Sequence, residues 1–326
     1  MDDQAPRAAF PRREPLFVHM HVPDSEAVRN ELVTGLLAEN AWIAPKYFYD
    51  ALGSRLFEAI CELPEYGLTR AEAEIFEAHG AEIAAAIGPN CTLIDLGAGN
   101  CRKAEKLFPL LKPAQYVAID IAAEHLLESL GGLQERHPEL EMVGLAQDFS
   151  GRLELPSVVR SQRRLFFYPG SSIGNFSPDE AERFLSQIKS HCNKDGMLLL
   201  GVDLLKDKAV MEAAYDDALG VTAAFNLNVL NHMNDLIGTN FNVRDWRHMA
   251  FFNEAESRIE MHLEARRAVE VQILNQIRRF RSGERIHTEN SYKYPPIQTG
   301  RGFTAAYDCS LRLTDVRDGF ELVLLR

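Results

Sequence analysis

Two glycines at the end of an apolar run mark the part of this sequence that is best suited to hold a ligand. Residues 93–96 are apolar apart from one aspartate, Gly97 and Gly99 follow, and a helix-like segment begins at Lys103. Glycine lets the backbone turn tightly and approach a bound molecule, which a side chain would prevent. The dinucleotide fingerprint GxGxxG is not met, because Arg102 stands where its third glycine belongs. We therefore expect a nucleotide-type ligand other than a dinucleotide.

Acidic residues close the next two apolar runs of the sequence. Asp120 ends the run 116–120, roughly 20 residues after the glycines, where an acid can accept both hydroxyls of a ribose. Asp148 and Phe149 follow the run 142–146 and can offer a carboxylate and a ring edge to an adenine. Each aspartate alone is most simply a solvated turn residue. Together with the glycine turn, acids at successive strand ends are typical of S-adenosylmethionine methyltransferases.

Composition narrows the kind of partner. The chain has 326 residues, 46% hydrophobic and 25% charged, with a formal net charge of -12. This length can build a large core. The acidic balance disfavours a nucleic-acid partner, because phosphate binding calls for clustered Lys and Arg, and it favours a small-molecule substrate. There is no apolar run of about 18 residues and no signal-peptide pattern. We expect a cytoplasmic monomer without membrane contact.

Neither the cysteines nor the histidines form a metal-binding pattern. The five cysteines are widely spaced without a CxxC pair, and the ten histidines include no HExxH array. We expect free thiols and no metal.

Strand-like and helix-like runs alternate through the middle of the chain, which predicts a parallel sheet covered on both faces. The strand-like runs are 91–96, 116–121, 142–146, 165–168 and 197–203. The helical patterns are 69–87, 103–111, 122–136 and 177–192, of which the first and last begin with capping boxes at Thr69 and Ser177.

After residue 207 the regular alternation of strand-like and helix-like runs ends, which predicts an inserted layer of structure. A helical stretch covers 209–236, an alternating strand covers 258–271, and 283–294 returns as the second strand of a hairpin. Strands at 310–314 and 320–325 then close the chain as an antiparallel hairpin.

The predicted fold class is α/β, with a Rossmann-like S-adenosylmethionine methyltransferase sheet that is parallel except for a C-terminal antiparallel hairpin. An inserted α+β substrate-binding domain accompanies it. We assign residues 1–23 to a flexible N-terminal arm. The methyltransferase domain comprises 24–70, 88–206 and 294–326, and the substrate-binding domain comprises 71–87 and 207–293.

With these features in place, the chain from about residue 45 onward resembles the L-histidine Nα-methyltransferases of the ergothioneine pathway. The resemblance rests on dispersed motifs in the same order, among them Tyr47-Phe48-Tyr49-Asp50, Leu63-Pro64-Glu65-Tyr66, Gly170-Ser171-Ser172-Ile173-Gly174-Asn175, Ala214-Tyr215-Asp216-Asp217, Ile259-Glu260-Met261 and Glu289-Asn290-Ser291-Tyr292-Lys293-Tyr294. It implies transfer of three methyl groups to the α-amino nitrogen of histidine, giving hercynine. The segment 294–302 departs from the family, which usually has a helix there, because Pro295 and Pro296 forbid a normal one.

The resemblance also implies roles for single residues. The S-adenosylmethionine contacts match Gly97, Gly99, Lys103, Asp120, Asp148 and Phe149. The substrate carboxylate contacts match Tyr66, Asn175 and Tyr215, and Gly170 matches a backbone contact. The imidazole contacts match Glu289 and Ser291, with Met261 packing beside the ring, and Tyr49 matches the tyrosine that faces the amino nitrogen.

Physical chemistry supports these roles. Methyl transfer is an in-line displacement, so the enzyme must chiefly position the nitrogen, about 3 Å from the methyl carbon. Glu289 and Ser291 are two residues apart on a strand and so share a face. Tyr49, with an ordinary pKa near 10, is a poor base at neutral pH, so we expect it to orient the amine.

Other interpretations stay open on the sequence alone. Tyr215, Met261, Glu289 and Asn175 would each, taken singly, be interpreted as core, hairpin or turn residues, and only their joint occurrence favours a site. A methyltransferase of the same architecture could act on tryptophan, although indole offers Glu289 and Ser291 one donor and no acceptor. A non-catalytic S-adenosylmethionine-binding regulator is a further alternative, and a nicotinamide oxidoreductase is disfavoured by Arg102.

Overall fold

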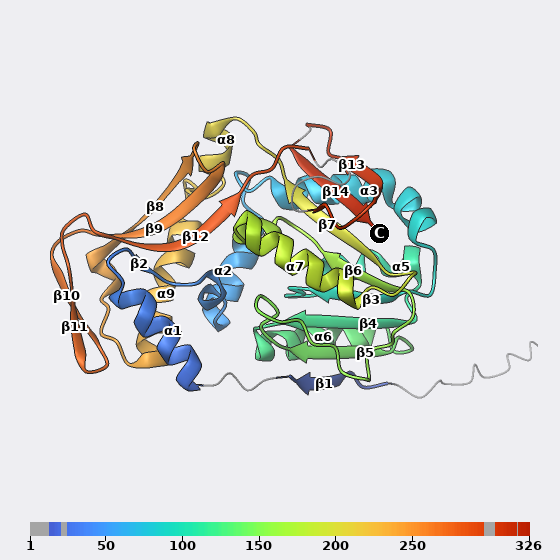
Figure 1. Ribbon diagram of the computed structural model, residues 1–326, viewed down its shortest axis with the longest axis horizontal. Coiled ribbons are helices and arrows are strands. Elements are labelled where there is room, and N and C mark those ends of the chain that lie inside the picture. The colour runs from blue at the N-terminus through green and yellow to red at the C-terminus, as the bar shows by residue number, and fades with distance from the viewer. Residues whose placement is uncertain (1–12, 21–24, 297–303, 318) are drawn as a thin grey trace, which may run out of the picture.

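Two sheets lie side by side along the long axis of the molecule (Figure 1). The computed structural model describes residues 13–20, 25–296, 304–317 and 319–326. Among these residues, no helix is both long enough and apolar enough to cross a membrane. All five cysteines are free thiols, as predicted.

The larger sheet has eight strands in the order β1-β5-β4-β3-β6-β7-β14-β13. They are β1 (Leu16–His19), β3 (Thr92–Leu96), β4 (Gln115–Asp120), β5 (Met142–Ala146), β6 (Arg164–Tyr168), β7 (Met197–Asp203), β13 (Cys309–Thr314) and β14 (Phe320–Leu325). Strands β1 and β3 to β7 are parallel, whereas β14 pairs antiparallel with β7 and β13. The predicted α/β fold with a closing antiparallel hairpin is confirmed.

Burial explains why the parallel strands could be read from the sequence. Every residue of β3 and β5 is buried, so these strands appear as largely apolar runs, interrupted in β3 by Thr92 and Asp95. The edge strand β1 was not predicted, because its burial is only partial and it lies in the expected flexible arm. Residues 16–19 are therefore a strand paired with β5, while 1–12 and 21–23 of that arm lie outside the described residues.

Helices cover both faces of the larger sheet. One face carries α3 (Leu68–Ile87), α5 (Phe108–Leu111) and α6 (Ala123–Arg136), and the other carries α7 (Pro178–His191). The capping box predicted at Ser177 is present at the start of α7.

One predicted helix start and one predicted helix span are wrong. Helix α3 begins at Leu68 without a side-chain cap, so Thr69 does not open it. The expected helix 103–111 is two single turns, α4 (Arg102–Glu105) and α5. Pro109 explains the interruption, since it has no N–H to donate to the preceding turn.

The smaller sheet has four strands in the order β2-β12-β9-β8. They are β2 (Ala41–Trp42), β8 (Trp246–Asn253), β9 (Arg258–Ala265) and β12 (Arg285–Tyr292). The hairpin of β10 (Val269–Ile273) and β11 (Gln276–Phe280) projects away from the larger sheet (Figure 1). The sequence predicted the pairing of β9 with β12, but it merged β9 with β10 and missed β8 and β11.

The helices around the smaller sheet come from two distant parts of the chain. They are α1 (Ser25–Leu37), η1 (Pro45–Phe48), α2 (Ala51–Cys61), α8 (Lys208–Ala213), α9 (Val221–Ile237) and η3 (Val243–Asp245). Residues 32–63 share one apolar core with α9 and the smaller sheet, whereas α3 belongs to the core of the larger sheet. This division differs from the predicted domain boundaries, because helical periodicity shows that a face is buried without showing which sheet buries it.

The predicted helix 209–236 is broken between α8 and α9. The Asp217 carboxylate accepts hydrogen bonds from the amides of Val221 (2.9 Å) and Thr222 (2.7 Å), and so caps α9. Gly220, just before α9, has a φ of 75°, which favours glycine. The break leaves Tyr215 between the two helices, with its hydroxyl turned toward β12.

Candidate active site

The glycine turn lies where the strand order of the larger sheet reverses, which is where open α/β sheets bind ligands. Gly97 and Gly99, just after β3, have φ values of 72° and 50°, so both require the freedom of glycine. The Gly99 amide donates to Asp120 Oδ2 at 2.8 Å. A Cβ atom on Gly99 would meet no atom within 4 Å, so the space in front of the turn is open.

The predicted strand-end acids lie on neighbouring strands. Asp120 ends β4, and its second oxygen accepts from the Ala122 amide at 2.9 Å. Asp148 follows β5 and forms an ion pair with Lys46 at 3.0 Å. Burial raises the pKa of the Asp148 carboxyl, but hydrogen bonds from Ser150 and the charge of Lys46 outweigh it, so the pKa is lowered.

These groups fit a nucleoside. Both carboxylates keep lone pairs beyond those that the protein uses, because each oxygen can accept more than one hydrogen bond. Phe149 stacks on Phe184, with ring centroids 5.8 Å apart, which provides an aromatic wall beside Asp148. The glycine turn, the acceptors and the ring therefore suit a ligand with a ribose and an adenine.

Lys103 is held by Glu72, the acidic residue of the capping box that was predicted to begin at Thr69. Glu72 of α3 is 2% exposed, and its Oε2 lies 2.7 Å from Lys103 Nζ. Its other oxygen accepts from the Gly170 amide at 2.6 Å. Burial lowers the pKa of Lys103, but the charge of Glu72 outweighs it and the pKa is raised. Glu72 thus joins α3 to the turn after β6, and nothing in its sequence position signals this.

A second group of polar side chains converges from separate elements of both sheets. Tyr215 Oη donates to Ser291 Oγ at 2.7 Å. The Asn175 amide nitrogen, oriented to donate, lies 3.2 Å from Glu289 Oε1. The ring of Tyr66 stands edge-on to that of Tyr215, with centroids 6.4 Å apart.

Tyr49 stands in an aromatic cluster that borders this group. Its ring contacts Phe57 and Phe225, with centroids 5.7 and 5.8 Å away. Burial, together with the nearby charges of Glu289 and Asp120, raises the pKa of Tyr49 well above its usual value. The pKa of Tyr49 therefore responds to one residue of the predicted histidine site, Glu289, and to one residue of the predicted S-adenosylmethionine site, Asp120.

Strand β12 presents Glu289 and Ser291 on one face, as predicted. They pair with Met261 and Ile259 of β9, whose side chains point into the apolar core. A bulge between His287 and Glu289 shifts the register of β12, so that Glu289 pairs with Met261 and faces the apolar core while His287 faces the other way. Without it, the alternation of side chains would put His287 on the same face as Glu289.

Burial shifts the pKa values of the polar side chains around Glu289. It raises the pKa of the Glu289 carboxyl to about 7, although the charge of Lys293 opposes the shift. It also raises the pKa values of Tyr66 and Tyr215, so that their hydroxyls stay neutral donors at neutral pH.

The sequence analysis did not predict one buried ion pair, which lies next to Tyr215 and Ser291. Lys293 Nζ lies 2.7 Å from Asp203 Oδ2, and the two side chains are 0% and 1% exposed. Lysine and aspartate are almost never fully buried unless they are paired. No local pattern could reveal the pair, since its members are far apart in the sequence.

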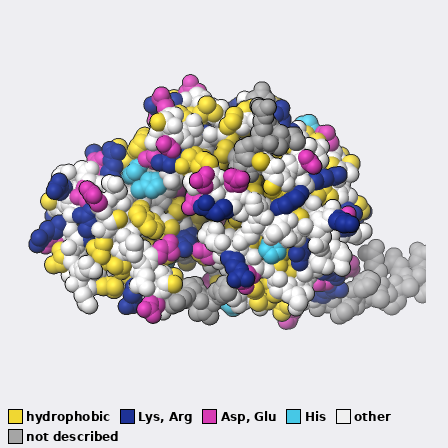
Figure 2. Space-filling view, viewed as in Figure 1, with side chains coloured by type: hydrophobic (Ala, Val, Ile, Leu, Met, Phe, Trp, Pro, Cys, Tyr) yellow, Lys and Arg dark blue, Asp and Glu magenta, His cyan; other side chains and the backbone are white. Residues whose placement is uncertain are grey.

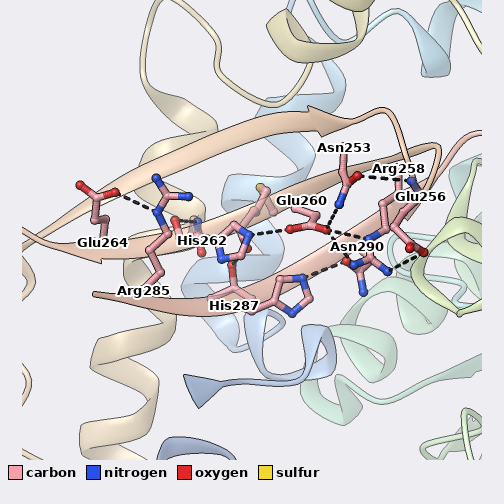
Figure 3. A network of polar contacts seen from close by, with 12 residues as sticks. Asn253, Glu256, Arg258, Glu260, His262, Glu264, Arg285, His287 and Asn290 are labelled. Atoms are coloured by element: carbon pink, nitrogen blue, oxygen red, sulfur yellow. Dashed lines mark hydrogen bonds and ion pairs between the residues drawn. The ribbon is translucent and has the colours of Figure 1, made fainter. Parts of the chain in front are cut away.

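One group of described residues has the ligand types of a metal site, but it lies on the opposite face of the smaller sheet from Met261. Atoms of Glu260, His262 and His287 lie within 4.8 Å of one another. Figure 3 shows that Glu260 is already engaged, by Arg258, Asn253 and His262. The group is explained as a polar network that stabilises the sheet, and the absence of a metal stays a prediction.

The parallel sheet with its closing hairpin, the glycine turn and the strand-end acids define the chain as a methyltransferase of the S-adenosylmethionine-dependent class. Comparison with known proteins refines this class. A family profile described as "Histidine-specific methyltransferase, SAM-dependent" matches residues 28–326, and the chain belongs to this family.

Two sequence relatives agree with the family. The chain is 39% identical to the histidine N-alpha-methyltransferase of Mycobacterium tuberculosis, over 86% of this chain and 88% of that protein. It is 32% identical to ergothioneine biosynthesis protein 1 of Neurospora crassa, over 79% of this chain and 30% of that longer protein. Among solved structures, the CcbJ methyltransferase of Streptomyces caelestis aligns with a TM-score of 0.44 at 13% identity, over 77% of this chain and 89% of that one.

Proposed function

We propose that this protein trimethylates the α-amino nitrogen of L-histidine with S-adenosylmethionine, giving hercynine, the first step of ergothioneine biosynthesis. Membership of the histidine-specific family supports the substrate. The observation that carries the proposal is that three separate elements bring together Asn175, Tyr215 and the β12 pair of Glu289 and Ser291, of which Tyr215 and Ser291 are buried.

The larger sheet binds the methyl donor in this proposal. When bound, S-adenosylmethionine supplies an electrophilic methyl group attached to a sulfonium. Gly97 and Gly99 provide the turn, Asp120 accepts from the ribose, and Asp148 with Phe149 binds the adenine. Lys103, fixed by Glu72, completes this side of the site.

The smaller sheet and the segments around it bind histidine at its two polar ends. Tyr66 and Asn175 donate to the carboxylate, and the Gly170 backbone and Tyr215, whose own proton is donated to Ser291, lie beside them. Glu289 and Ser291 bond the ring nitrogens, and Met261 packs on the ring. Both carboxylate donors are neutral, and the charge of the nearby Lys293 ammonium is balanced by Asp203.

Tyr49 orients the amine in this account. The raised pKa of its hydroxyl keeps it protonated at neutral pH, so it is a poor acceptor for the proton that the ammonium must lose. A positive charge on the bound methyl donor favours loss of that proton to solvent. Holding the amine in line then supplies the main rate enhancement.

Tryptophan is the alternative substrate, and the pair of Glu289 and Ser291 disfavours it. An indole has one N–H donor and no acceptor, which would leave one of the buried groups without a partner at a cost of about 1–3 kcal/mol. From composition, we also propose a metal-free cytoplasmic monomer that does not bind nucleic acid.

Calorimetry and mass spectrometry together test the proposal. In the presence of S-adenosylhomocysteine, histidine should bind at least tenfold more tightly than tryptophan. With S-adenosylmethionine, histidine should gain three methyl groups on its α-nitrogen. Tight binding of S-adenosylhomocysteine without methylation of any amino acid would instead support a regulator.

A further inference from the structure

The buried Lys293 uses its full hydrogen-bonding capacity on three partners. Besides Asp203, its ammonium donates to Ser291 Oγ at 2.8 Å and to Tyr215 Oη at 3.1 Å. An ammonium has three donors and no acceptor. Its position is therefore fully determined by one carboxylate and two hydroxyls of the candidate site.

The backbone holds this ion pair where the two sheets meet. Asp203 is the last residue of β7, and Lys293 comes directly after β12. The Tyr294 amide donates to the Asp203 carbonyl at 3.0 Å, and the Leu205 amide donates to the Tyr294 carbonyl at 3.0 Å. The ammonium thus sits on two segments that are bonded to each other.

Lys293 limits the hydrogen bonds that Ser291 can make with a ligand. Its oxygen accepts from Lys293 at 2.8 Å and from Tyr215 at 2.7 Å. A hydroxyl has two acceptor lone pairs and one donor, so the only capacity that Ser291 keeps is donation. Without Lys293, the same hydroxyl could rotate and serve equally as an acceptor.

A fixed donor beside a carboxylate is complementary to a neutral imidazole. That ring has one N–H, which Glu289 can accept, and one bare nitrogen, which can accept from Ser291. We propose that Lys293, anchored by Asp203, is a positioning residue that holds Ser291 as a donor and thereby makes the site select a ring with both a donor and an acceptor. This inference rests on the proposed function.

A purely structural role for Lys293 would be to neutralise the buried Asp203. The chain offers a matched control for that role, because Lys206 contacts the other oxygen of Asp203. Lys206 is 24% exposed, and its other hydrogen bond goes to the Gly319 carbonyl and not to Tyr215 or Ser291. Replacing either lysine removes a cation from Asp203, but only one of them touches the site.

The test is a double-mutant cycle on histidine affinity, read by calorimetry with S-adenosylhomocysteine present. The variants are Lys293→Met, Ser291→Ala, both together, and the control Lys206→Met. We expect K293M and S291A each to weaken histidine binding about tenfold, the effect of losing one hydrogen bond in a buried site. The double variant should be no more than twofold weaker than S291A, because Lys293 acts through Ser291.

Affinity for S-adenosylhomocysteine serves as the readout of folding and should change less than twofold in every variant. K206M should leave histidine affinity within twofold of the original protein. If K293M fails to bind S-adenosylhomocysteine, the neutralised pair K293M/D203N replaces it in the cycle, with the same expectation.

Three results would overturn the inference. The first is unchanged histidine affinity in K293M, and the second is a double variant whose loss is the product of the two single losses. The third is an equal loss in K206M, which would assign the effect to Asp203. Failure of the unaltered protein to bind histidine would be seen before any variant is compared, and would contradict the proposed function itself.

Discussion

Glu289 shows how a residue of the proposed site costs stability. Its pKa is raised from 4.5 to about 7, so the folded protein holds this proton over a pH range where the unfolded chain has released it. Stability contributed by the residue therefore falls as pH rises from about 4.5 to 7 and stays low above that.

Replacement of this carboxylate separates stability from function. Glu289→Gln should be more stable than the original protein at pH 8, by up to roughly 3 kcal/mol, and equally stable near pH 4.5. Urea unfolding at the two pH values measures this. The same variant should bind histidine at least tenfold more weakly and S-adenosylhomocysteine unchanged. Equal loss of both ligands would contradict our placement of Glu289.

Asp120 provides the corresponding test on the larger sheet. Asp120→Ala should raise the dissociation constant of S-adenosylhomocysteine at least tenfold, since it removes the acceptor for the ribose and for the Gly99 amide. Calorimetry measures the constant, and a cooperative thermal transition shows that the fold is retained. Unchanged affinity in a folded variant would remove Asp120 from the proposed site.

Local motifs could identify the residues of the glycine turn, because the turn, the strand end and the acid are close in the sequence or one strand apart. They could not identify Glu72, Asp203 or Lys293. The partners of these residues come from distant segments, and a buried charge in an otherwise ordinary stretch carries no periodic signal.

Among the elements, sequence patterns predicted the parallel strands and α7, but they did not predict the side-chain cap that separates α8 from α9. Apolar periodicity continues through 209–236, whereas the carboxylate of Asp217 closes a new helix start within it. A side-chain cap competes with helix continuation, and the periodicity of apolar residues does not register that competition.

The cap is therefore expected to position Tyr215. Asp217→Ala should lower the free energy of unfolding by about 1–2 kcal/mol, the usual cost of losing an N-terminal cap. It should also weaken histidine binding several-fold, because Tyr215 lies between the two helices.

The neighbouring exposed Asp216 is the matched control. Asp216→Ala should change stability by no more than about 0.5 kcal/mol. Urea unfolding and calorimetry on both variants measure the two effects. Stability loss in D217A with unchanged histidine affinity would show that the break does not position Tyr215.

At the scale of the whole molecule, alternation of strands and helices sufficed to predict the larger sheet. It did not predict that residues 32–63 join the core of the smaller sheet, although they precede the larger one in the sequence. Which core a helix enters depends on the tertiary path of the chain, which local patterns do not encode.

The oligomeric state is the part of the proposal that concerns the whole molecule. Figure 2 shows Lys and Arg side chains mixed with Asp and Glu over the visible face. Light scattering should give the mass of one chain, with and without histidine. A stable dimer that dissociates on mutation of the smaller sheet would contradict the proposal of a monomer.

The most direct measurement of the central claim is a competition among all the common amino acids in one reaction with S-adenosylmethionine. Fragmentation mass spectrometry of the products identifies the amino acid that is methylated and the nitrogen that carries the methyl groups. We predict that histidine is consumed first and ends with three methyl groups on its α-nitrogen. Preferential methylation of another amino acid, or of an imidazole nitrogen, would contradict the account.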